Sequence, residues 1–196
     1  MARRVTVGSG SGYWGSTWKP ALELAQSGVV QYIGFDYLAE LTMSLMQRAR
    51  LRDPSKGYAE DMIEMLQQLL PAALSNGTRL IANGGATNPG AAADLALQFA
   101  HAQGLPLKVG VVTGDDVLET VRRLDREGYP FRNMDTGEEG LDGIRDRLVA
   151  AHAYLGADGI VTALGEGADV VITGRVSDNA LFVGPLMHEL GWHYED

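Results

Sequence analysis

The sequence predicts a three-layer α/β/α fold with a mainly parallel, Rossmann-like sheet. Short apolar runs alternate with stretches of helical periodicity, and glycine or polar clusters follow the runs. No two-residue hairpin turn joins neighbouring runs. Strands that alternate with helices form a parallel sheet covered on both faces. We therefore expect a single α/β domain over residues 1–196.

The apolar runs and the stretches between them define the expected elements. Strands are predicted at residues 5–7, 29–35, 80–82, 109–112, 148–155 and 169–173. Helices are predicted at residues 17–27, 38–50, 59–74, 88–104, 116–127, 158–167 and 178–190. Right-handed crossovers then place the carboxyl ends of all the strands on one edge of the sheet.

Single residues predict where helices begin and break. Asn88, followed by proline, is a strong helix start. Asp116 with an acid three residues later resembles a capping box, and Ser177 is expected to cap the closing helix. Pro71 is expected to kink or split its helix, because proline lacks the backbone N–H.

Composition excludes several classes of function. Hydrophobic residues make up 45% of the chain, yet no run approaches the roughly 18 apolar residues of a membrane span. There is no cysteine, which excludes disulfides, thiol catalysis and thiolate metal sites. The net charge of −9 argues against nucleic acid and anionic membranes as partners. No signal-peptide pattern is recognised, and we expect a cytoplasmic protein.

Polar and glycine residues far apart in sequence are expected to meet at the common strand edge, where open α/β sheets bind ligands. Two of them, Asp115 and Asp178, are the candidate acid or base. The other candidate ligand-binding residues are Ser9, Ser11, Tyr13, Trp14, Asp36, Asn83, Gly84, Gly85, Asn88, Thr113, Gly114, Arg175 and Ser177.

Two features at this edge suggest an anionic ligand. The Asn83–Asn88 turn offers backbone N–H groups at a helix N-terminus, and the alternative is that the asparagine only caps the helix. Arg175 follows the last strand and carries a planar fork suited to a carboxylate or phosphate. The alternative for Arg175 is a structural ion pair with Asp178 or Asp36.

A dinucleotide site is a weaker alternative. Gly10, Gly12 and Gly15 match the G-x-G-x-x-G pattern after a strand, and Asp36 ends the next strand, as a ribose-binding acid would. Tyr13 and Trp14 crowd the turn that a pyrophosphate would approach. We expect that NAD(P)H does not bind and that the two aromatic side chains contact hydrocarbon.

The four histidines give no metal site. His188 and His193 are one residue too far apart for the H-E-x-x-H motif, and Gly191 is expected to end the helix between them. His152 is expected near the tip of a strand, where it could reach the site, but we leave it out of the site. The sequence identifies no cofactor.

Several long segments, in a consistent order, resemble the acyclic terpene utilisation protein A (AtuA) family. They are Gly8–Gly15 (GSGSGYWG), Tyr32–Met43 (YIGFDYLAELTM), Asn83–Pro89 (NGGATNP) and Thr173–Pro185 (TGRVSDNALFVGP). Ala153–Ala157 (AYLGA) fits as well. The resemblance covers nearly the whole chain. Family members are longer, so the resemblance implies that this sequence is the N-terminal part of such a protein.

The resemblance implies a role in the breakdown of branched acyclic terpenes through acyl-CoA intermediates. We expect an enzyme domain that acts on a branched acyl-CoA or isoprenoid acid. A non-catalytic ligand-binding or scaffold subunit of a catabolic complex is the alternative. We also expect a homo-oligomer, or a missing C-terminal region, because the closing helix would expose an apolar face made of Leu181, Phe182, Leu186, Leu190 and Trp192.

Overall fold

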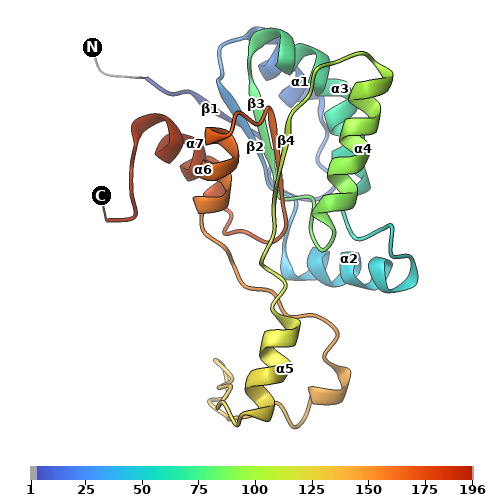
Figure 1. Cartoon of the computed structure of the whole chain (residues 1–196), viewed down its shortest axis with the longest axis vertical. Coiled ribbons are helices and arrows are strands. Elements are labelled where there is room, and N and C mark those ends of the chain that lie inside the picture. The colour runs from blue at the N-terminus through green and yellow to red at the C-terminus, as the bar shows by residue number, and fades with distance from the viewer. Residues whose placement is uncertain (1–3, 196) are drawn as a thin grey trace.

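A five-stranded, all-parallel sheet forms the centre of the computed structural model, which describes residues 4–195 (Figure 1). The strand order is β1-β2-β3-β5-β4. The strands are β1 (Val7–Ser11), β2 (Tyr32–Phe35), β3 (Arg79–Ala82), β4 (Val109–Val112) and β5 (Val170–Thr173). This architecture confirms the predicted fold class, although β1 begins only where the predicted first strand ends.

Helices cover both faces of the sheet. They are α1 (Lys19–Ser27), α2 (Glu40–Arg52), α3 (Glu60–Asn76), α4 (Pro89–Ala102), α5 (Leu118–Arg126), α6 (Asp158–Gly165) and α7 (Ala180–Leu190). One face carries α1, α3 and α4, and the other carries α6 and α7. Figure 1 shows α2 lying across the end of the sheet where the strands terminate. No helix within residues 4–195 is long and apolar enough to cross a membrane.

Each face of the sheet has its own hydrophobic core. On the α3 side, Leu66 and Leu69 lie at helical spacing and are at most 1% exposed. On the α6 and α7 side, Ile160 and Leu181 are fully buried. Burial of a side chain of this size is worth roughly 1.5–3 kcal/mol, so the two layers together hold the sheet in place.

The predicted strand at residues 148–155 is wrong. This segment makes only isolated bridges, between His152 and Asp116 and between Leu155 and Val176. It does not join the sheet, whose edge strands are β1 and β4. Its isolated bridges are to the segments that follow β4 and β5, so it runs beyond the ends of those strands and forms no continuous ladder.

The helix signals predict positions better than they predict side-chain contacts. Pro71 neither splits nor ends α3, which continues to Asn76. Asn88 precedes α4 as predicted, but its side chain makes no cap hydrogen bond. The capping box at Asp116 is absent, because its carboxylate accepts a hydrogen bond from the backbone N–H of Leu118, only two residues further on. Ser177 does not cap the last helix, which begins at Ala180.

The closing helix α7 does not present the uncovered face that was expected. Leu181 is fully buried. The ring of Phe182 packs closely on Gly34 of β2, since a Cβ on that glycine would lie 2.7 Å from the ring. Of the five apolar residues in question, Trp192 remains exposed, at 47%. The sheet and α6 therefore cover most of this helix, and its surface gives no argument for association.

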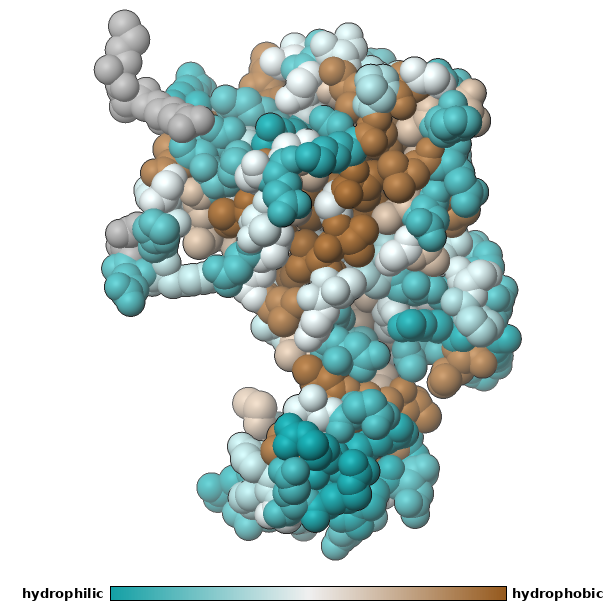
Figure 2. Space-filling model, in the orientation of Figure 1, coloured by the Kyte–Doolittle hydropathy of each residue, from teal (hydrophilic) through white to brown (hydrophobic). Residues whose placement is uncertain are grey.

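Residues 116–150, which we call the lobe, project beyond the sheet and contain α5 and a short 3₁₀ helix at Arg145–Arg147 (Figure 1). No side chain in the lobe is buried. Figure 2 shows a largely hydrophilic surface on the lobe, below a main body with broad apolar areas. The lobe joins the body through two chain segments that include its own ends, residues 113–117 and 149–154, which we call the neck.

Candidate functional site

The carboxyl ends of β3 and β5 mark the place where this topology can hold a ligand. The strands are neighbours, but the helices that follow them, α4 and α7, cover opposite faces of the sheet. In open α/β sheets, ligands bind in the crevice that such a reversal creates. The turns after these two strands carry Asn83 and Arg175.

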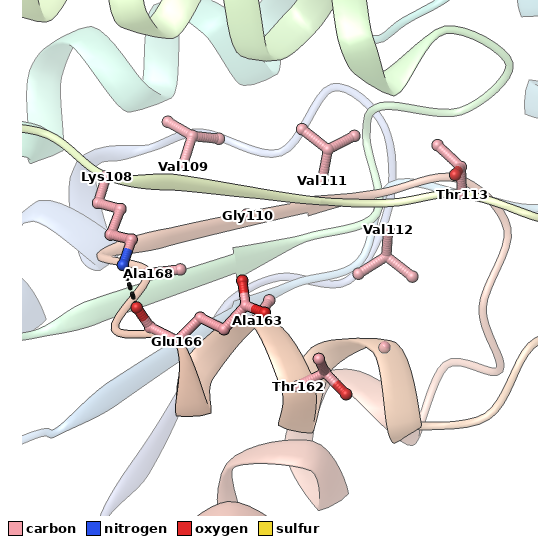
Figure 3. A pocket seen from close by; sticks show the side chains of 11 residues that line it. Lys108, Val109, Gly110, Val111, Val112, Thr113, Thr162, Ala163, Glu166 and Ala168 are labelled. Atoms are coloured by element: carbon pink, nitrogen blue, oxygen red, sulfur yellow. Dashed lines mark hydrogen bonds between the residues drawn. The ribbon is translucent and has the colours of Figure 1, made fainter.

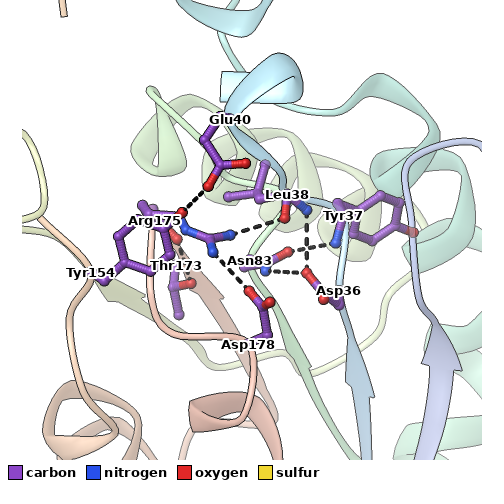
Figure 4. A network of polar contacts seen from close by, with 10 residues as sticks. Asp36, Tyr37, Leu38, Glu40, Asn83, Tyr154, Thr173, Arg175 and Asp178 are labelled. Atoms are coloured by element: carbon purple, nitrogen blue, oxygen red, sulfur yellow. Dashed lines mark hydrogen bonds and ion pairs between the residues drawn. The ribbon is translucent and has the colours of Figure 1, made fainter. Parts of the chain in front are cut away.

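Asn83 holds the loop after β2. It is fully buried, and its Oδ1 accepts a hydrogen bond from the backbone N–H of Tyr37 at 2.7 Å. Its Nδ2 donates to Oδ1 of Asp36 at 2.7 Å (Figure 4). The Ser11 hydroxyl donates to the Asp36 carbonyl at 3.1 Å. These contacts pair both ends of the buried amide and tie the ends of three strands together.

Arg175 is 4% exposed and binds several elements of the chain. Nη1 donates to the Leu38 carbonyl at 2.9 Å, and Nη2 donates to Oδ1 of Asp178 at 2.8 Å (Figure 4). The Tyr154 ring lies against the guanidinium, with 4.0 Å from its centroid to Cζ. Nε is buried and has no hydrogen-bond partner among the described residues. The ion pair with Asp178, which was the alternative to ligand binding for Arg175, is therefore present, and one nitrogen of the guanidinium has no partner within residues 4–195.

Asp115 and His152 form a buried pair at the neck of the lobe. Oδ2 of Asp115 lies 3.0 Å from Nδ1 of His152 and accepts the backbone N–H of Arg175 at 2.9 Å. The Asp115 carbonyl accepts the N–H of Ala153 at 2.7 Å. Gly174 makes room for the carboxylate, since a Cβ there would lie 2.3 Å from Oδ1. The predicted site omits His152, and the structure brings it there through a partner 37 residues away in sequence.

A pocket of about 220 Å³ lies between the first turn of α2 and the neck. His152 and Arg175 both line it, and the His152 side chain is 11% exposed. The remaining lining residues are Glu40, Met43, Ser44, Ala150, Ala151 and Tyr154. The pocket therefore combines a charged floor and a histidine with mainly apolar walls.

Tyr154 and Glu40 close one side of this pocket. The Tyr154 hydroxyl donates to Oε1 of Glu40 in a short hydrogen bond (Figure 4). This bond raises the pKa of the Tyr154 hydroxyl and lowers the pKa of the Glu40 carboxyl. The tyrosine is therefore the donor and the carboxylate the acceptor at neutral pH.

Other predicted site residues lie elsewhere. Trp14 lines a separate apolar pocket of about 230 Å³ on α2, with Leu45 and Met46, whereas Tyr13 is 67% exposed and does not line it. Thr113 lines a groove of about 320 Å³ beside β4 and α6 (Figure 3). The structure therefore divides the predicted residues among three places.

The turn after β3 is explained by packing. A Cβ on Gly85 would lie 2.6 Å from the Thr173 carbonyl, and one on Gly84 would lie 2.8 Å from the Met62 sulfur. The Asn88 amide donates to the carbonyls of Pro54 and Lys56, away from the Asp115 pair. These contacts account for the residues of the turn without an anion.

Four more predicted residues lie near the strand ends without lining the pocket. Ser9 is exposed on β1, and its hydroxyl donates to the Ser11 carbonyl at 3.4 Å. Gly114 has a φ of 114° at the start of the neck, and Ser177 is half-buried between β5 and α7. Asp178 pairs with Arg175 and has a side chain that is 60% exposed, so its observed contact is with the chain itself.

The glycine-rich turn has structural explanations as well. A Cβ on Gly10 would lie 2.1 Å from the Phe35 ring. The N–H of Gly15 donates to Oδ2 of Asp61 at 3.0 Å. Burial raises the pKa of the Asp61 carboxyl. A pyrophosphate at this turn would meet an acidic side chain that already uses the Gly15 N–H.

Within residues 4–195, no group of three histidine, aspartate or glutamate side chains is arranged to hold a metal ion. Nε2 of His188 lies 3.4 Å from Nη1 of Arg79. Gly191 ends α7 in the left-handed conformation, as predicted, so His193 lies beyond the helix.

A family model described as "Acyclic terpene utilisation family protein AtuA" matches residues 5–196. The chain belongs to this family. The match covers all the segments in which the sequence resembles AtuA proteins, including the turns that carry Asn83 and Arg175. Searches of curated proteins and of solved structures gave no match.

Proposed function

We propose that this AtuA-family chain is an enzyme domain that transfers a proton on a branched acyl-CoA or isoprenoid acid in terpene catabolism. His152 is the general base or acid, and Asp115 orients it. The observation that carries the proposal is the 3.0 Å contact between these side chains at the wall of the pocket. Family membership supports the terpene context.

The Asp115–His152 contact sets the state of the imidazole. A carboxylate only accepts hydrogen bonds, so Nδ1 of His152 carries the proton that the contact requires. The neutral ring then has its lone pair on Nε2, which is the atom available for proton transfer. A fixed tautomer and orientation are what a general base needs. Asp115 thereby replaces Asp178 as the carboxylate closest to the proposed chemistry.

The pocket suits the acyl end of a ligand. Met43, Ala150 and Ala151 offer apolar walls to a branched hydrocarbon. Its volume of about 220 Å³ falls below the roughly 300–1,000 Å³ of pockets that enclose whole drug-sized ligands. A carrier as large as CoA would therefore remain outside the pocket while the acyl group enters.

A non-catalytic ligand-binding or scaffold subunit is the second candidate. The exposed lobe favours it, because a projecting surface is available to a partner protein. It also accounts for Arg175, whose two terminal nitrogens are used within the chain. A dinucleotide site is the least favoured candidate, because the Gly15 N–H that a pyrophosphate would need already donates a hydrogen bond to the Asp61 carboxylate.

The test uses isovaleryl-CoA in D₂O, with mass spectrometry to follow deuterium entering the carbon next to the thioester. We expect the wild type to catalyse exchange and His152→Gln to slow it by about 10²-fold or more, as for loss of a general base. Asp115→Asn should slow exchange as well. His101→Gln, at an exposed histidine on α4, is the matched control and should exchange at the wild-type rate.

Two outcomes would reject the catalytic proposal. Exchange by His152→Gln at the wild-type rate would remove the histidine from the chemistry. Binding of isovaleryl-CoA by the wild type with no exchange and no other conversion would favour the non-catalytic candidate.

A further inference from the structure

One nitrogen of the Arg175 guanidinium, Nε, has no hydrogen-bond partner in the described part of the chain. The terminal nitrogens donate to Leu38 and Asp178, whereas Nε is buried. Leaving a buried donor unsatisfied is costly, and more so when the group is charged. Such a donor calls for an explanation, and a ligand oxygen in the adjoining pocket provides one.

Tyr154 covers this arginine. Its ring stacks on the guanidinium at 4.0 Å, while the residue itself is 53% exposed. The ring is held from outside by the hydroxyl contact with Glu40, which is also exposed. The ring is therefore held over the guanidinium by one cation–π contact and one surface hydrogen bond, and a ligand that reaches the arginine must displace both.

We propose that Arg175 Nε–H binds one oxygen of a flat acyl group, either a carboxylate or a thioester carbonyl. Tyr154 covers this acyl-oxygen site until a ligand displaces it. A single N–H donor in the plane of the guanidinium suits one sp² oxygen. It does not suit phosphate, which the full fork would hold by two bonds. The inference rests on the pocket of the proposed function and names the group recognised there.

The experiment follows the Arg175 Nε–H signal by NMR, assigned through its loss in Arg175→Lys. Isovalerate is the probe, and 3-methyl-1-butanol supplies the same carbon skeleton without the carboxylate. We expect isovalerate to shift the signal, and the alcohol and inorganic phosphate to leave it in place. Tyr154→Ala should bind isovalerate about fivefold more tightly, since the cation–π contact no longer competes.

Two further variants keep the result interpretable. Tyr154→Phe retains the ring but loses the Glu40 contact, so its affinity should lie between those of wild type and Tyr154→Ala. Tyr129→Ala, at a tyrosine of similar exposure in the lobe, should bind like the wild type. Circular dichroism of each variant checks that the fold is retained.

Several results would overturn the inference: a signal unmoved by saturating isovalerate, an equal shift with phosphate, or weaker binding by Tyr154→Ala. None of these measurements needs turnover. If the wild-type protein binds isovalerate at Arg175 but does not exchange deuterium, the proposed proton transfer is rejected and the acyl-oxygen site at Arg175 still stands.

Discussion

The sheet body and the lobe of residues 116–150 show two ways in which similar local sequence patterns are used. Helix α3 in the body buries Leu66, Leu69 and Leu70 against the sheet. Helix α5 in the lobe is also amphipathic, but no residue of it is buried. Periodicity thus predicts both helices, whereas only the packing around them decides how much each contributes to stability.

The lobe is too small to form a core of its own. Units below about 40 residues usually need disulfides, metals or association, and this chain has no cysteine. Surface ion pairs hold it, such as Arg145 with Asp125 and Arg123 with Glu127. At the neck, the N–H of Val117 donates to the carbonyl of Ala151, and the N–H of Ala153 donates to that of Asp115. The candidate pair therefore lies where the weakly packed region joins the strongly packed one.

The largest expected contrast comes from matched leucine truncations. Leu66→Ala leaves a cavity in the body and should cost about 2–5 kcal/mol of unfolding free energy. Leu124→Ala in α5 removes a half-buried side chain and should cost less than about 1 kcal/mol. Urea denaturation measures both variants. Equal losses would mean that the lobe is packed as tightly as the body.

A second contrast tests the junction itself. Gly174→Ala places a Cβ 2.3 Å from the Asp115 carboxylate, and such overpacking costs about 1–3 kcal/mol. It should also displace Asp115 from His152 and slow deuterium exchange on isovaleryl-CoA. Gly12→Ala, where no atom lies within 4 Å of the added Cβ, should change neither quantity. Wild-type stability in Gly174→Ala would show that the neck adjusts freely.

The smallest contrast is a pH dependence of opposite sign in the two regions. Burial raises the pKa of Asp61, so the folded body binds this proton more readily than the unfolded chain. Ionised Asp61 therefore destabilises the folded body once the pH rises above the pKa of an ordinary aspartate, about 3.9. Asp61→Asn should stabilise the body at pH 7, where the carboxyl of the unfolded chain is ionised. It should not do so near pH 3, where that carboxyl is largely protonated.

In the lobe, Arg145 lowers the pKa of Asp125, so ionised Asp125 contributes stability that is lost as pH falls through the lowered value. Asp125→Asn should therefore loosen the lobe at pH 7 and have less effect in acid. Hydrogen exchange of lobe amides at the two pH values measures this change. A shift of the same sign for both variants would contradict the comparison.

Local patterns alone determined most of the elements. The apolar runs predict β3, β4 and β5, and the helical spacing predicts α2 and α3, within a few residues. The turn signal at Gly191 worked, since this glycine ends α7 in the left-handed conformation. These features are visible in sequence because neighbours in the chain decide them.

Only the tertiary structure decided how the site is assembled. Residues 148–155 do not join the sheet but run along the neck, where they make only isolated bridges. That path brings His152 to Asp115, and it sets Tyr154 over Arg175. Contacts across 21 to 37 positions depend on strand order and on the space that packing leaves, and neither is encoded in any local stretch of residues.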